Sequence, residues 1–147
     1  MSGARWSTRH CERAVSSSTP EEANQAAVLA RKAEAGATAV RELVGNPEIT
    51  DEIVGFHAQQ AIEKWLKALM ASRGMDEARI HDIGRLLQLL ENDGAKLPGN
   101  AARLDDLTIY AVPMSYDELL GAEPLDREAT VELIDEVDRW AKNVLSP

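Results

Sequence analysis

Three polar side chains that could bind phosphate or move a proton share one edge of a predicted helix in the middle of the chain. They are His57, Gln60 and Lys64, at positions i, i+3 and i+7, which lie on one face of a helix. An imidazole donates a hydrogen bond or carries a proton, an amide donates or accepts, and an ammonium group attracts phosphate. Lys67 flanks this edge. The pattern predicts a polar groove that receives a nucleotide or an RNA backbone.

A second pair that could line the same groove is His81 and Asp82, at the start of the next predicted helix. The Asp82 carboxylate could orient the imidazole, and His57 and His81 are then the candidate general bases. No other catalytic residue is identified. The ordinary alternatives are a solvated or dimer-facing helix edge for His57, Gln60 and Lys64, and helix capping for Asp82. The sequence leaves these alternatives open.

Most familiar catalytic and metal-binding signatures are absent from the sequence. It contains no glycine-rich phosphate loop, no His-Glu-x-x-His pair and one cysteine, Cys11, so we expect neither a metal site nor a cofactor. A single cysteine forms no intrachain disulfide, which is typical of a reducing compartment. No apolar run is long enough to cross a bilayer. We therefore expect a cytoplasmic protein without a membrane partner.

The net charge of −9 is unevenly distributed along the chain. Residues 117–138 contain nine acidic residues and one basic residue, Arg127, which gives a local net charge of −8. Residues 57–103 contain seven basic and six acidic residues, a net charge of +1. Because counterion release from phosphates drives nucleic-acid binding, a polyanion would meet the middle of the chain. The acidic stretch is most simply a solvated face, and docking onto a basic partner is its functional alternative.

Helices are the elements that must position these residues. Hydrophobic residues make up 44% of the chain and aromatic residues only 4%, and Ala, Leu, Glu and Arg dominate, which favours helices. No segment alternates polar and apolar residues over the length of a strand. The 147 residues suit one domain. We therefore expect an all-α protein, a single bundle of about five helices.

Capping signals and breakers set the bounds of the predicted helices. Thr19, followed three residues later by Glu22, forms a capping box at the first helix. The expected helices span, in order, residues 20–44, 48–73, 82–92, 101–112 and 127–145. Residues 113–125 are expected to form a loop. We expect residues 1–20 to be a disordered tail and residues 21–147 to be the helical domain.

The segment FHAQQAIEKWLKAL, residues 56–69, resembles the HEPN domain family, together with Arg73-Gly74, His81-Asp82-Ile83 and Leu86-Leu87. The Phe-His-Ala-Gln-Gln-Ala-x-Glu-Lys run is the more specific part of the resemblance, which covers about residues 22–145. It implies a small helical bundle that is usually a homodimer. It also implies pairing with a minimal nucleotidyltransferase as a toxin–antitoxin couple or, in some members, ribonuclease activity.

The nuclease motif of catalytic HEPN members is absent from the region expected to fold. That motif is an Arg followed by four to six residues and a His near the last helices, and no histidine follows His81. Arg73 and His81 are separated by seven residues, and Arg5 and His10 fit the spacing but lie in the expected tail. We therefore expect a HEPN-type domain that binds a nucleotide, RNA or a cognate nucleotidyltransferase, without strong intrinsic nuclease activity. A ribonuclease toxin and a purely structural dimerisation module are the alternatives.

Overall fold

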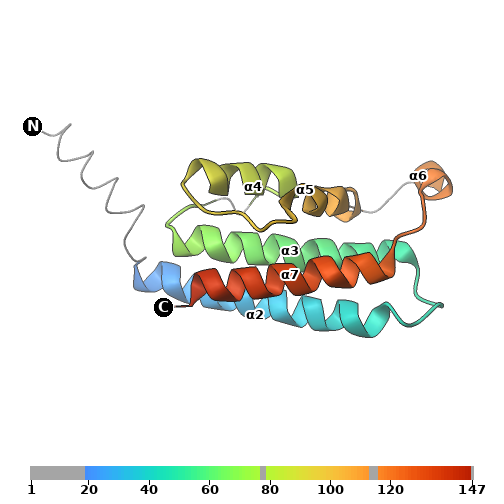
Figure 1. The fold of residues 1–147 in the computed structure, drawn as a ribbon, viewed down its shortest axis with the longest axis horizontal. Coiled ribbons are helices and arrows are strands. Elements are labelled where there is room, and N and C mark those ends of the chain that lie inside the picture. The colour runs from blue at the N-terminus through green and yellow to red at the C-terminus, as the bar shows by residue number, and fades with distance from the viewer. Residues whose placement is uncertain (1–18, 77–78, 113–115, 147) are drawn as a thin grey trace, which may run out of the picture.

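Three long helices lie side by side and form the body of the fold (Figure 1). The computed structural model describes residues 19–76, 79–112 and 116–146. Helices α2 (Pro20–Leu43) and α3 (Asp51–Ser72) form an antiparallel pair, and α7 (Arg127–Leu145) packs against both. The described residues contain no strand, so the predicted all-α class is confirmed. No helix of this described part is long and apolar enough to span a membrane.

The shorter elements cover the other side of α3. Helix α4 (Ile83–Asn92), helix α5 (Ala101–Leu104) and the 3-10 helix η1 (Asp105–Tyr110) form this layer, and α6 (Tyr116–Gly121) lies at one end of the bundle (Figure 1). Helix α3 therefore lies between two layers, and 14 of its 22 residues are buried. Polar residues on another face of α3 are buried together with its apolar stripe. The stripe consists of residues at helical spacing: Val54, Ala58, Ala61, Ile62, Trp65 and Leu69.

The predicted helix bounds are close for the four longer helices and wrong in the region that follows α4. The helix predicted at residues 101–112 is a single α-helical turn, α5, which continues as η1 and ends at Tyr110. Asp105 accepts a hydrogen bond from the Thr108 hydroxyl, three residues on, and such local bonds compete with the regular helical ladder. Asp105 also accepts a hydrogen bond from the amide of Gly84, at the start of α4. The loop predicted at residues 113–125 contains α6, whose first turn carries two acids that favour a helix N-terminus.

The predicted caps are confirmed. The Glu22 amide donates to Thr19 Oγ1 (3.2 Å) and the Thr19 amide donates to Glu22 Oε1 (2.7 Å), which is the reciprocal pair of a capping box. Asp82 Oδ1 accepts a hydrogen bond from the Arg85 amide (3.1 Å), so Asp82 caps α4. Residues 1–18 of the expected tail lie outside the described residues, and Pro20 already belongs to α2.

Small residues let α2 and α3 approach closely. Ala33 and Ala37 are fully buried between the helices, and a Cβ atom added to Gly36 would lie 3.2 Å from the Cβ atom of Ala61. This contact agrees with the small-residue stripe that the sequence shows on the first helix. The close approach fixes the distance between the backbones of α2 and α3, and with it the pocket described below.

A buried polar network around Asp138 ties α2, α3 and α7 together. The indole nitrogen of Trp65 donates to Asp138 Oδ1 (2.6 Å), and the Arg41 guanidinium donates to Asp138 Oδ2 (2.8 Å). Arg41 also binds the half-exposed carboxylate of Asp135. Trp65 is therefore a core residue with a satisfied polar atom, as its place on the apolar stripe predicts.

Candidate functional site

A fully buried carboxylate, Glu63 on α3, is the centre of a polar cluster. Its Oε1 atom accepts a hydrogen bond from Gln59 Nε2 (3.1 Å) and lies 3.0 Å from His81 Nδ1. Its Oε2 atom lies 3.3 Å from Lys67 Nζ and 3.7 Å from Lys64 Nζ. We call Gln59, Glu63, Lys64, Lys67 and His81 the Glu63 cluster. Four side chains, three from α3 and one from the segment before α4, thus surround one carboxylate.

The surroundings of Glu63 keep it ionised. Burial alone raises the pKa of Glu63. Hydrogen bonds from Gln59 and His81, together with the charges of Lys67 and His81, lower this pKa by more than burial raises it, so it lies below its ordinary value. An ionised buried carboxylate is stable only when it is paired and hydrogen-bonded. This requirement explains why Lys67, only 8% exposed, lies inside the fold.

His81 connects the cluster to solvent. Its side chain is 61% exposed, while its Nδ1 atom is held against Glu63. Its backbone carbonyl accepts a further hydrogen bond from Gln59 Nε2 (3.1 Å), which fixes the segment before α4. When the neutral ring carries its proton on Nδ1, Nδ1 donates a hydrogen bond to the carboxylate and Nε2 keeps its lone pair. The exposed side of the ring therefore leaves Nε2 accessible to a ligand.

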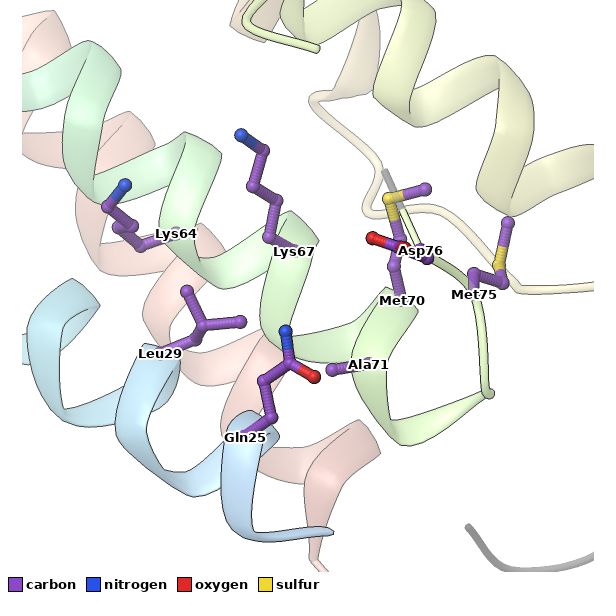
Figure 2. Close-up of a pocket in the computed structure, with 8 residues that line it drawn as sticks. All are labelled: Gln25, Leu29, Lys64, Lys67, Met70, Ala71, Met75 and Asp76. Atoms are coloured by element: carbon purple, nitrogen blue, oxygen red, sulfur yellow. The ribbon is translucent and has the colours of Figure 1, made fainter. Parts of the chain in front are cut away.

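Lys64 and Lys67 also line a pocket between α2 and α3, shown in Figure 2. Its volume is about 150 Å³, and we call it the lysine pocket. Both lysine side chains extend from α3 toward the same side of the pocket (Figure 2). The remaining walls are formed by Gln25, Leu29, Met70, Ala71, Met75 and Asp76. The pocket walls therefore combine an apolar surface, the carboxylate of Asp76 and two lysines that already contact Glu63.

The structure brings together only part of the edge predicted from the sequence. Lys64 and His81 approach the same carboxylate, and Gln60 donates to Gln59 Oε1 (2.8 Å), next to the cluster. His57 lies elsewhere. Its ring meets Phe56 edge to face, with 5.6 Å between ring centroids, and it lines a separate hollow near the other end of α3. Asp82 follows His81 in the chain, and its carboxylate serves as the α4 cap.

Gln59 and Glu63, at the centre of the site, were not predicted from the sequence, and Lys67 was named only as a flanking residue. Gln59, Glu63 and Lys67 follow one another at intervals of four residues, so they share a face of α3. That spacing was the available signal, but it is equally typical of a solvated face. Their importance comes from burial, which depends on the layer of α4 and η1 covering α3. In the described residues no group of three or more His, Cys, Asp or Glu could hold a metal ion.

Comparison with known proteins supports the family that the sequence resembles. Residues 26–144 match the HEPN domain. No curated protein and no solved structure matches the chain. The matched range begins in the first turns of α2 and ends in the last turn of α7, and it includes the Glu63 cluster and the lysine pocket except for Gln25. The chain belongs to the HEPN domain family.

Proposed function

We propose that this HEPN domain binds a phosphate-bearing ligand, a nucleotide or RNA, at the lysine pocket, without strong intrinsic nuclease activity. The observation that carries the proposal is the pair of lysines that one buried, ionised carboxylate holds at a pocket. A chain with a net charge of −9 repels polyanions over much of its surface, so a site for phosphate must concentrate cations locally. Glu63 does so by holding Lys64 and Lys67 together at one edge of the pocket, whose wall also contains Asp76.

The size of the pocket indicates which part of the ligand it receives. Pockets that enclose a whole small molecule have volumes of about 300–1,000 Å³. The lysine pocket, at about 150 Å³, suits a phosphate group, while the rest of the nucleotide would lie over the outer surface of α2 and α3. The Lys64 side chain is three times as exposed as that of Lys67. Lys64 is therefore the cation that meets the phosphate, and Lys67 stays paired inside.

Lys64→Glu should weaken binding of ATP, GTP or a short single-stranded RNA by at least about tenfold, because it replaces a charge-assisted contact with repulsion. Helicity should stay unchanged, since the partly exposed Lys64–Glu63 pair at 3.7 Å contributes little to folding. Calorimetric titration and circular dichroism measure the two effects.

Lys32→Glu is the matched control, because Lys32 is exposed on α2 and the change in net charge is the same. It should retain the affinity of the unmodified protein. Equal affinity of all three proteins, or an equal fall in both variants, would reject the lysine pocket as the binding site.

A second candidate function, ribonuclease activity, is favoured by the pairing of Glu63 with His81. A buried carboxylate that orients an exposed imidazole through Nδ1 is the arrangement of a general base. Incubation of the purified chain with RNA tests this alternative. Cleavage that His81→Ala abolishes and His57→Ala preserves would assign the activity to His81. Intact RNA, with growth unaffected when the chain is expressed alone, supports the binding function.

The proposal includes two partners that sequence resemblance implies, a second copy of the chain and a cognate minimal nucleotidyltransferase. Sedimentation of the purified chain measures the first, and co-purification with the product of a neighbouring nucleotidyltransferase gene measures the second. A binding domain of this kind would act by presenting its ligand or its surface to such a partner.

A further inference from the structure

The end of the bundle around Tyr110 is hollowed in a way that the lysine pocket does not explain. A hollow of about 470 Å³ lies beside Ile53, Phe56 and His57, and two others, of about 290 Å³ and 280 Å³, lie toward Glu123 and Pro124. All three share Tyr110 in their walls. We call the residues that line these three hollows the Tyr110 face.

Large apolar side chains gather on the Tyr110 face. The described part of the chain has seven exposed large hydrophobic residues, and four of them line or adjoin these hollows: Ile53, Phe56, Ile109 and Val112. Val112 is the most exposed of the four, at 65%. Single exposed apolar residues are ordinary, but a group around one concave surface indicates an interaction site.

The Tyr110 face is a rigid part of the fold. The Tyr110 ring is buried against α3, where a Cβ atom added to Gly55 would lie 2.5 Å from its Cγ atom. Only a glycine leaves room for the ring at this distance. The ring therefore fixes η1 against the N-terminal half of α3, and a partner would meet a preformed surface that costs little to order.

Charge on the Tyr110 face is strongly negative. The three hollows are lined by one basic residue, Arg103, and by five acidic residues: Asp51, Glu52, Asp106, Glu123 and Asp126. Asp51 is already paired, with Arg127. Two copies of this chain meeting through this face would bring like charges together, which costs several kcal/mol in an interface. The face therefore suits a basic partner and not itself.

We propose that the Tyr110 face docks a basic amphipathic helix of a partner protein. Such a helix would place its apolar side against Ile53, Phe56 and Val112, and its lysines or arginines toward Asp106 and Glu123. Recognition of an amphipathic helix by an apolar groove combines burial of anchor residues with pairing of charges at the rim. The interaction surface lies apart from the lysine pocket, since the two share no lining residue.

Fluorescence anisotropy of a labelled amphipathic Leu/Lys peptide of about 18 residues, long enough to form a helix, tests the proposal. The unmodified protein should bind this peptide and not a peptide of the same composition with Leu and Lys in scrambled order. Ile53→Asp should weaken binding at least about tenfold, because it removes an apolar anchor residue. The loss is expected even though the new negative charge attracts the basic peptide. Val28→Asp is the matched control, since Val28 is exposed to a similar degree on α2 (37% against 44%).

The double variant Asp106→Asn, Glu123→Gln examines the charges without touching the core, because both residues are exposed. It should bind the Leu/Lys peptide more weakly and with less dependence on salt. Equal binding of the scrambled peptide, or equal affinity of Ile53→Asp and Val28→Asp, would overturn the proposal. A homodimer that Ile53→Asp converts to a monomer would also overturn the proposal, because the Tyr110 face would then bind a second copy of this chain. Lys64→Glu should bind the peptide normally, so the failure of either site leaves the other testable.

Discussion

Replacing Glu63 with Ala should lower the free energy of unfolding by about 3–5 kcal/mol, the usual cost of removing one partner from a buried ion pair. The variant removes the buried carboxylate that lies 3.3 Å from Lys67 Nζ, and it removes the acceptor that holds Gln59 and His81. The Glu63–His81 contact between α3 and the segment before α4 is lost with it, which leaves the hydrogen bond from Gln59 to the His81 carbonyl. Urea unfolding followed by circular dichroism measures the change.

Two variants serve as controls for Glu63→Ala. Glu42→Ala removes an exposed glutamate from α2 and should change stability by no more than about 0.5 kcal/mol. Glu63→Gln keeps the size of the side chain and removes only its charge, so its loss of stability should fall between the two. A Glu63→Ala protein as stable as Glu42→Ala would show that the cluster contributes nothing to folding.

The charge of Glu63 also predicts how stability varies with pH. Because its pKa in the folded protein lies below the ordinary value of 4.5, the unfolded chain binds the proton more tightly, and ionised Glu63 stabilises the fold above that pH. This contribution is lost as pH falls through the folded-state pKa. The stability difference between the unmodified protein and Glu63→Gln should therefore be full near neutral pH and shrink in acid. A constant difference would contradict an ionised Glu63.

Asp138→Ala should lower the free energy of unfolding by about 2–3 kcal/mol, because it leaves the buried indole N–H of Trp65 without an acceptor. It also removes one of the two carboxylates that bind Arg41, so α2, α3 and α7 lose a common contact. For a chain of this size the melting temperature should fall by roughly 4–12 °C. Thermal unfolding followed by circular dichroism measures the change.

Asp135→Ala is the matched control for Asp138→Ala. Asp135 binds the same guanidinium at the same 2.8 Å distance, but its side chain is 42% exposed and contacts no buried donor. Its loss should cost no more than about 1 kcal/mol. If the two variants were equally stable, the Trp65 hydrogen bond would add nothing beyond a surface ion pair.

The Glu63 cluster both stabilises the fold and positions the lysines of the proposed site. A test of the site must therefore separate loss of binding from loss of stability. A Glu63 variant that failed to bind a nucleotide would have lost both its lysine arrangement and its stability. Lys64 is the better residue to replace, because its long ion pair at the edge of the cluster can be removed while the buried Lys67–Glu63 pair remains. The Tyr110 face, built on different residues, provides an independent check on folding in that variant.

The helices were predictable from local signals. Thr19 and Glu22, the apolar stripe that contains Trp65 and the cap at Asp82 act within a few residues of one another, so the chain itself carries the information. The prediction was wrong where local signals are weak, at η1 and α6. At η1, the hydrogen bond from the Gly84 amide to Asp105 joins segments that are 21 residues apart in the sequence.

The sequence by itself determined the all-α class, the bounds of the long helices and the resemblance to the HEPN family, because periodicity and capping are local properties. Only the tertiary structure decided which polar residues matter. On a single helix Glu63 and Gln60 are equivalent polar positions, and their difference comes from the layer of α4 and η1 that buries one and leaves the other at the edge. The same packing joins His81 to Glu63 and leaves His57 on the Tyr110 face, since residues far apart in the chain meet only where helices cover one another.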